Sequence, residues 1–224
     1  MAAGGKSPTP LHNNCSGKHA GFLCLARPRG EPAAGYHKTD HPTMRAVTAV
    51  LVEFTGAPLD ESRAAIDGCS IPAFALPLRS LALGFAQLGS GAAVLPELSV
   101  AAARIRAALV AAPKILAGAG RFDTELAVAA GKAALSKCGA ERVAAAVPDR
   151  GLGIAIKIDD GGMRAVEPIM AAVLTAFAPA SPPLGEFLAG RLCHPRVNWN
   201  GLTVGEIRLA AELPLLLANQ VAMP

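Results

Sequence analysis

Residues 12–21 read HNNCSGKHAG, and this stretch sets a thiol, an amine and two imidazoles close together in the chain. Cys15 stands three residues before Lys18, so both side chains fall on one face of a helix that begins here. We expect that helix over residues 16–26, because the proline and glycine residues of ARPRGEP follow and end it. A cysteine and a lysine one helical turn apart are the starting point for any functional interpretation.

Two of the interpretations concern known loop and nucleophile chemistry. A phosphate-binding loop is disfavoured, because His12 and His19 stand where the glycine and the Ser or Thr of such a loop belong. A nucleophilic thiol would be Cys15, with a pKa lowered by the helix start and by a nearby ammonium, and either histidine could serve as its base.

Two further interpretations use the same residues. Metal ligation would bring the Cys15 thiolate and a neutral Lys18 amine onto one ion such as Zn²⁺, which competes with the proton for both groups. The natural third ligand is Cys69, in the turn sequence IDGCSIP. The remaining interpretation is a capped helix with a buried cysteine and a solvated lysine, and spacing alone does not decide between these alternatives.

The composition describes a folded protein with few charges. Hydrophobic residues make up 52% of the 224 residues and charged residues 17%, which excludes a disordered chain and favours one principal domain. The net charge of +4 is spread along the sequence, so we expect no nucleic-acid partner. No stretch fits a secretion signal or an uninterrupted membrane span, and the cysteine count of five argues against a disulfide framework; we expect a cytoplasmic protein without membrane association.

The order of the expected elements indicates the class of fold. Helices are predicted at 41–55, 77–89, 96–112, 123–135 and 164–178, and strand-like runs at 141–148, 151–159 and 200–210. Helices first and strands later favour an α/β sandwich with a largely antiparallel sheet over a doubly wound parallel one.

Four single residues carry structural expectations. Asp40 and Asp123 stand where the caps of the helices at 41–55 and 123–135 belong. Cys24 lies in the apolar run GFLCLA and is expected to pack as a small core residue. Trp199 is expected to pack rather than to bind a ligand.

Several blocks in a fixed order make the chain similar to a known family. LHNNCSGKHAGF, YHKTDHPTMRAV, IDGCSIPAFALPL, AGAGRFDTEL and SKCGAE follow one another from about Leu11. With them the chain resembles the bacterial L-asparaginase II family typified by the Rhizobium enzyme. The resemblance implies a fold like that of serine β-lactamases and penicillin-binding proteins, with helices packed on a largely antiparallel sheet. Residues 11–224 are expected to form the asparaginase II domain and residues 1–10 a loose leader.

The resemblance implies hydrolysis of L-asparagine to L-aspartate and ammonia, and it implies a zinc ion. In the family the metal is held by the Cys and Lys of CSGKH and by the Cys of DGC, with water as a further ligand. The matching residues here are Cys15, Lys18 and Cys69, the three that the spacing also proposes.

Three other residues match family positions near the substrate. His19 and Asp67 match residues beside the metal and the substrate, although a surface histidine and a turn-forming aspartate would look the same in sequence. Lys137, in SKCG, matches a lysine that partners a serine in the second of two Ser–Lys pairs. A lone K-x-G is also what an exposed lysine on a strand edge would show.

The family's nucleophile has no counterpart in these residues. It is a serine three residues before a lysine on a helix, a spacing that lets a neutral lysine take the serine proton. No lysine of this sequence has Ser or Thr at that position. We therefore expect an N-terminally truncated member that starts partway through the domain, with exposed apolar faces that make it marginally stable, dimeric or prone to aggregate.

The family thus predicts an enzyme with a small-molecule substrate, whereas the residue inventory predicts a protein that is inactive alone. Two functions of other classes stay open. One is a non-catalytic zinc-binding or interaction protein built on the same fold. The other is a thiol-dependent amidase that uses Cys15 or Cys69 as its nucleophile.

Overall fold

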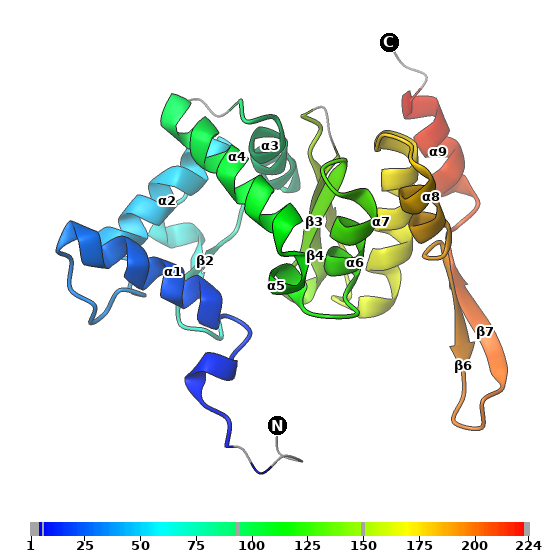
Figure 1. Cartoon of the computed structure of the whole chain (residues 1–224), viewed down its shortest axis with the longest axis horizontal. Coiled ribbons are helices and arrows are strands. Elements are labelled where there is room, and N and C mark those ends of the chain that lie inside the picture. Colours follow the sequence, from blue (N-terminus) through cyan, green and yellow to red (C-terminus); the bar gives the residue numbers. More distant parts are fainter. Residues whose placement is uncertain (1–4, 6, 93–94, 149–150, 222–224) are drawn as a thin grey trace. The chain divides into compact units, whose positions relative to one another are not determined.

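The computed structural model describes residues 5, 7–92, 95–148 and 151–221 (Figure 1). The chain divides into two compact units, residues 1–76 and residues 77–224. Among the described residues no helix has the length and apolar character needed to cross a membrane.

The first unit combines two α-helices with a short β-hairpin in its described part. Its elements are η2 (Pro10–His12), α1 (Ser16–Ala26), η3 (Arg27–Arg29), α2 (Pro42–Thr55), η4 (Glu61–Arg63), β1 (Ala64–Ile66) and β2 (Pro72–Phe74). The two strands pair antiparallel with Ile66 opposite Pro72, so residues 67–71 form the connecting turn. The helix predicted at 16–26 is confirmed residue for residue.

Helix α2 is capped by His41 and not by Asp40, so this part of the sequence prediction is wrong. The His41 Nδ1 atom accepts the Thr43 amide hydrogen at 3.1 Å, and Nε2 donates to the Pro32 carbonyl oxygen at 2.9 Å. The ring is thereby held at both nitrogens, and it satisfies an amide that has no partner within the helix. Pro42 at the first helical position fits because proline has no amide hydrogen to lose there.

The core of the first unit is small. Among its described residues the buried hydrophobic side chains are Ala26, Met44 and Ala57. Cys24 is exposed on α1, so the expectation that it packs in a core is wrong. The apolar run around Cys24 therefore does not mark a buried helix face.

The second unit is built around a three-stranded antiparallel sheet. Its helices are α3 (Leu78–Ser90), α4 (Pro96–Ala111), α5 (Pro113–Ala117), α6 (Phe122–Ala130), α7 (Met163–Phe177), α8 (Pro182–Ala189) and α9 (Glu212–Val221). Its strands are β3 (Ala134–Cys138), β4 (Val143–Pro148), β5 (Ile154–Lys157), β6 (Cys193–Val197) and β7 (Thr203–Arg208), with the 3-10 turn η5 (Ala140–Arg142) before β4. The order β3-β4-β5 forms the sheet, and β6 and β7 form a separate hairpin.

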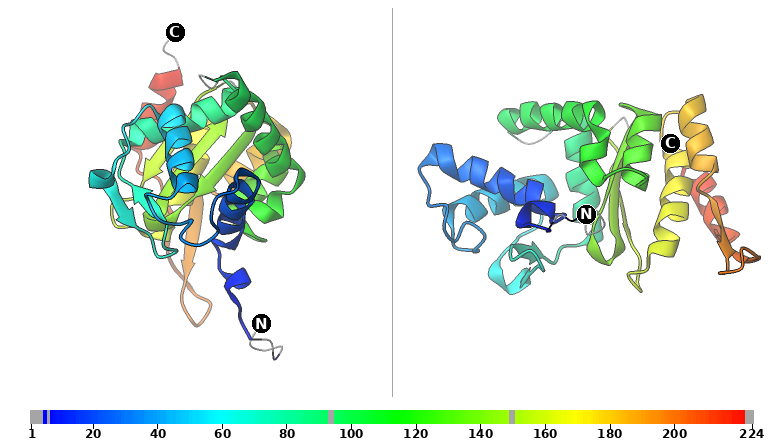
Figure 2. Two further views of the ribbon diagram at one scale, coloured as in Figure 1. Left: turned by 90° about the vertical axis from the view of Figure 1, so that its left-hand side faces the viewer. Right: turned by 60° about the horizontal axis from the view of Figure 1, so that its bottom comes forward.

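Helices cover both faces of the β3-β4-β5 sheet, with α3 and α4 on one side and α7 on the other (Figures 1 and 2). Alternation along the strands explains this arrangement. Ala134 of β3 and Ala146 of β4 pack into the cluster that contains Met170 of α7, whereas Leu135 and Val147 pack with side chains of α4 to α6 on the opposite face.

Two glycines let α3 approach the sheet closely. A Cβ atom at Gly153 would lie 1.7 Å from the Ala82 carbonyl oxygen, and one at Gly89 would lie 1.9 Å from Cγ2 of Val147. At Gly153 the nearest atoms belong to the helix backbone, so any larger residue there would force α3 and the strand apart.

The mixed α/β class and the antiparallel pairing are confirmed, but the strands form three small sheets in the described residues in place of one larger sheet. The helix predicted at 123–135 ends at Ala130, because Gly131 turns the backbone with a φ of 57°. Asp123 is not its cap but a buried residue within it. Trp199 is 105% exposed at the turn between β6 and β7, so the expectation that it packs is wrong.

Candidate metal centre

The first turn of α1 and the β1–β2 turn bring four polar side chains together in the first unit. The Lys18 ammonium donates a hydrogen bond to Cys69 Sγ at 3.3 Å, across 51 positions of sequence. The ligand atoms of Cys15, Asp67 and Cys69 all lie within 4.8 Å of one another. The three residues that the spacing and the resemblance propose as ligands, together with Asp67, thus form one cluster.

Local hydrogen bonds fix the backbone on both sides of this cluster. The Cys15 amide donates to Asn13 Oδ1 at 2.8 Å, which holds the cysteine at the start of the helix. The Cys69 amide donates to Asp67 Oδ2 at 3.1 Å, and the Ser70 amide donates to the Asp67 carbonyl oxygen at 2.8 Å. Asp67 therefore shapes the turn as well as contributing a carboxylate, which combines the two roles that its sequence position left open.

The charges in the cluster influence one another. Hydrogen bonds from Cys69, with a smaller contribution from the Lys18 charge, hold the pKa of Asp67 below its usual value. Desolvation and the hydrogen bond with the Asp67 carboxylate raise the pKa of the Cys69 thiol. Without a cation, the cluster accordingly contains an ionised carboxylate beside a protonated thiol, and a bound metal ion would displace the thiol proton.

This donor set fits a zinc ion. Zinc takes thiolate, nitrogen and carboxylate ligands in a tetrahedral arrangement, and the cluster offers two sulfurs, one amine and one carboxylate. The lysine amine can bind only when it is neutral, and a metal ion can hold it in that form.

His19 follows the lysine on α1 and is held by a residue that sequence reasoning missed. Its Nδ1 atom lies 2.6 Å from the Tyr36 hydroxyl, and the two rings meet edge to face with centroids 5.6 Å apart. Tyr36 opens the block YHKTDHP, so its place in that block was the available signal. His12, the other candidate base, instead accepts the Thr9 amide hydrogen at 2.9 Å.

Lys137 belongs to the second unit and is exposed on β3, where its ammonium donates to the Cys138 carbonyl oxygen. Asp123 of α6 holds both neighbours of this lysine. Its Oδ1 accepts from the Ser136 hydroxyl at 2.6 Å, and its Oδ2 accepts from the Cys138 amide at 2.9 Å. The aspartate expected as a helix cap therefore ties the helix to the edge strand of the sheet.

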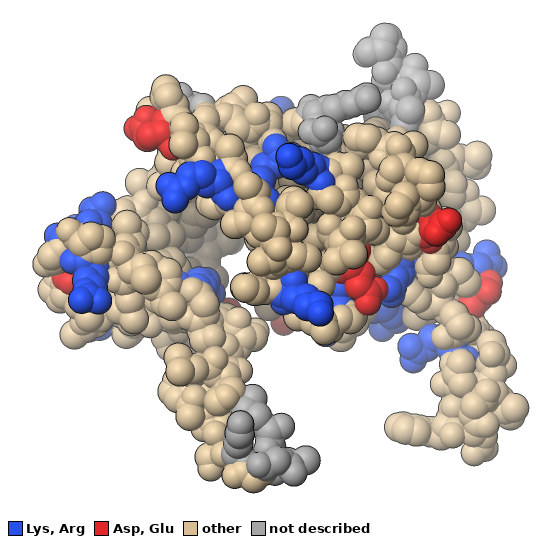
Figure 3. Space-filling model, viewed as in Figure 1, with Lys and Arg blue, Asp and Glu red and all other residues tan. Residues whose placement is uncertain are grey.

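Charged side chains occur in small separate groups on the face shown in Figure 3, most of which is uncharged.

Cys15 and Lys18 at the start of α1 lie close to Cys69 of the β1–β2 turn. This mixed α/β protein therefore has a candidate site for a divalent cation. Comparison with protein families then identifies the family of the chain. The model of the L-asparaginase II family matches residues 1–209, and the chain belongs to this family. A comparison with curated proteins gave no match.

Proposed function

We propose that the protein is an asparaginase-type amidohydrolase that converts L-asparagine and water to L-aspartate and ammonia. The observation that carries this proposal is the match of the L-asparaginase II model over residues 1–209. The reaction breaks the C–N bond of the substrate's carboxamide, with water supplying the hydroxyl of the new carboxyl group.

We further propose that Cys15, Lys18 and Cys69 hold a zinc ion, with Asp67 beside them. The support is the meeting of two sulfurs, an amine and a carboxylate from separate segments of the first unit. Bound there, zinc would supply a positive charge that orients or polarises a carbonyl oxygen of the substrate.

The protein's own residues would bind the substrate and move protons. Asp67, whose pKa is lowered, is ionised near neutral pH and can pair with an α-ammonium group. His19, with Nδ1 engaged by Tyr36, can present Nε2 to a substrate oxygen or nitrogen. Lys137 would be the amine that the resemblance assigns to the second Ser–Lys pair of the family.

A non-catalytic zinc-binding protein is the second candidate. It is favoured by one observation, namely that no lysine of the sequence follows a Ser or Thr at the three-residue spacing of the family nucleophile. A thiol-dependent amidase that uses Cys69 is less favoured, because the raised pKa of Cys69 keeps that thiol protonated and a protonated thiol is a poor nucleophile.

The test combines zinc content with ammonia release by the purified chain of 224 residues. Purified wild type, Cys15→Ser, Cys69→Ser and the control Cys24→Ser are loaded with zinc, dialysed, and assayed with L-asparagine with and without a chelator. Cys24 is exposed on the same helix, so its replacement tests for a general effect of losing a thiol. We expect about one zinc per molecule in wild type and Cys24→Ser, and at least about tenfold weaker zinc binding in the other two variants.

Each outcome separates the candidates. Ammonia release that falls with the chelator and in Cys69→Ser supports the hydrolase. Bound zinc without ammonia release from folded protein rejects hydrolysis by this protein and supports the zinc-binding function. Release that survives the chelator but is abolished by thiol alkylation supports the amidase.

A further inference from the structure

The candidate metal centre contains two free thiols that come from separate segments of the first unit. Cys15 precedes α1, and Cys69 lies in the β1–β2 turn. Their sulfur atoms lie within 4.8 Å of each other, and both residues are half-buried, so a small solute can still reach them. Two thiols at this distance are as well placed to react with each other as to share a metal ion.

The backbone positions of the two cysteines allow the sulfurs to meet. A disulfide bond is about 2 Å long, so side-chain rotation and a small backbone shift must bring the two sulfurs closer together. Neither cysteine lies inside a helix or a strand, because Cys15 is the residue before α1 and Cys69 stands at the centre of the turn 67–71. A shift of either residue therefore leaves the hydrogen bonds between β1 and β2 in place.

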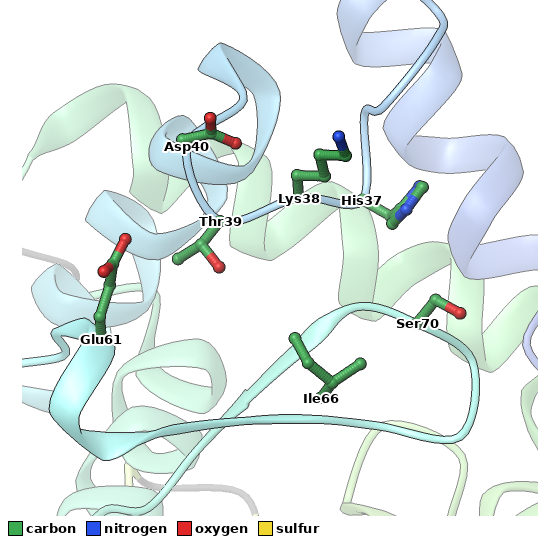
Figure 4. A pocket seen from close by; sticks show the side chains of 7 residues that line it. All are labelled: His37, Lys38, Thr39, Asp40, Glu61, Ile66 and Ser70. Carbon is green, nitrogen blue, oxygen red and sulfur yellow. The ribbon is translucent and has the colours of Figure 1, made fainter.

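The turn that carries Cys69 has open space beside it. The next residue, Ser70, lines a hollow of about 430 Å³ together with Ile66 of β1 and the loop before α2 (Figure 4). Ile66 is 69% exposed, so the hollow is not filled by a packed core. The Ser70 backbone has a φ of 74°, in the left-handed region that non-glycine residues seldom adopt. The turn can thus shift without giving up a favourable conformation at Ser70.

Cys24 is a third thiol of the same unit, and it lies too far from Cys15 to pair with it. It is exposed near the other end of α1, about 13 Å from Cys15 along the helix axis at 1.5 Å per residue. Oxidation of Cys24 can therefore give a sulfenic acid, a higher oxide or a bond to another molecule, but no disulfide with Cys15 in the folded helix. Cys24→Ser is accordingly a matched control, because it removes an accessible thiol and leaves the pair intact.

We propose that Cys15 and Cys69 form a reversible disulfide when the metal-free protein meets a peroxide, and that this disulfide and a zinc ion exclude each other. One thiol attacks hydrogen peroxide, the O–O bond breaks, and a sulfenic acid and one water form. The second thiol attacks the sulfenic sulfur, the S–O bond breaks, the S–S bond forms, and a second water leaves. The two thiols are thereby oxidised and the peroxide is reduced to water.

The disulfide removes both thiolates from the candidate centre. A metal ion needs deprotonated sulfur ligands, so oxidation withdraws two of the three proposed zinc ligands and leaves the Lys18 amine. A bound zinc ion in turn occupies the sulfur electron pairs that would attack the peroxide. The effect on zinc rests on the zinc site proposed above, whereas the disulfide itself needs only the two thiols.

The experiment follows the disulfide by mass and the zinc by metal analysis, so neither readout depends on activity. The purified chain of 224 residues is reduced, freed of metal with a chelator and treated with hydrogen peroxide. Cys15→Ser, Cys69→Ser and the control Cys24→Ser are treated in the same way. Peptide mass spectrometry should find Cys15 linked to Cys69, with the loss of two hydrogen atoms, in wild type and in Cys24→Ser.

Zinc binding is measured on the same samples. The oxidised wild type should bind zinc at least about tenfold more weakly than the reduced protein, and a dithiol reductant should restore the binding. Zinc that is loaded beforehand should slow disulfide formation at least about tenfold.

The outcomes separate this inference from the proposed zinc site. Peroxide that leaves the two cysteines as separate sulfinic acids, or that joins Cys69 to Lys18, overturns the inference, while zinc bound by the reduced protein keeps the zinc proposal standing. Oxidised protein that binds zinc as tightly as reduced protein overturns the mutual exclusion. A Cys15–Cys69 disulfide in a protein that binds no zinc when reduced supports the disulfide and rejects both the zinc site and its redox control.

Discussion

Asp123 and Cys138 show how a buried carboxylate controls its neighbours. Asp123 is 4% exposed and accepts hydrogen bonds from Ser136 and from the Cys138 amide. Burial, and next the Asp123 charge, raise the pKa of the Cys138 thiol to about 12. This thiol is therefore neutral at physiological pH, and the proximity of Lys137 does not activate it.

We predict that Cys138 is alkylated much more slowly than Cys24. At pH 8 the thiolate fraction of Cys138 is very low, and we expect iodoacetamide to modify it about 100-fold more slowly than the exposed Cys24, measured by peptide mass spectrometry over time. Asp123→Asn removes the negative charge with little change of shape and should accelerate only the Cys138 reaction. Equal rates for the two cysteines in the folded wild type would contradict the prediction.

The same pKa has a consequence for stability. Because the folded-state pKa is raised from 9.0 to about 12, the protonated thiol contributes fully to the free energy of unfolding below pH 9. That contribution is lost as the pH rises from 9.0 toward 12.

Some site residues could be predicted from sequence and others could not. Cys15 and Lys18 share a helical turn, so their juxtaposition follows from local geometry. Cys69 became a candidate through its turn and through family resemblance. The contact between His19 and Tyr36 joins side chains 17 positions apart and depends on how the loop after α1 folds back, which no periodicity encodes.

Among the elements, long helices were predictable where a proline or a glycine marks the first or last residue. The helix predicted at 96–112 is α4 (Pro96–Ala111), because proline marks its start. The prediction at 123–135 failed at its end, where the alanine-rich sequence continues past Gly131 although the backbone turns into β3. At this point the positive φ of Gly131 and the pairing of β3 with β4 outweigh the helix propensity of the alanine-rich sequence.

Helix α3 provides a prediction about packing. Gly153→Ala would place a Cβ atom 1.7 Å from the Ala82 backbone oxygen of α3, an atom that cannot move without shifting the helix. We expect the free energy of unfolding to fall by about 1–3 kcal/mol, measured from urea unfolding curves with an unchanged slope.

The matched control is Gly185→Ala in α8, where an added Cβ atom meets nothing within 4 Å. This change should raise the free energy of unfolding by about 0.5–1 kcal/mol, because alanine loses less conformational freedom in a helix. If both variants unfolded like wild type, the close approach of α3 to β5 would be disproved.

At the scale of the whole molecule, the two units differ in how they are stabilised. The second unit has an extended core of buried residues between its sheet and helices, whereas the described part of the first buries few hydrophobic side chains. The composition did not reveal this division, because burial depends on contacts between distant segments. A ligand that binds only the folded first unit should stabilise it strongly.

We therefore predict that zinc protects the first unit selectively against hydrogen exchange. At a zinc concentration about 100 times the dissociation constant, the stabilisation is about 2.7 kcal/mol. Amides of α1 and of the β1–β2 hairpin should exchange more slowly, while those of β3 to β5 should not change. Cys69→Ser should abolish the protection, and equal protection of β3 to β5 would contradict the assignment of the metal to the first unit.

The position of Trp199 determines what tryptophan fluorescence can report about this protein. The sequence has one tryptophan, and its indole projects from the β6–β7 turn with 105% exposure. An indole that is already in water changes its emission little when the cores unfold. Intrinsic fluorescence will therefore follow whatever comes to touch this hairpin, and a flat emission signal during heating is compatible with complete loss of the folded core.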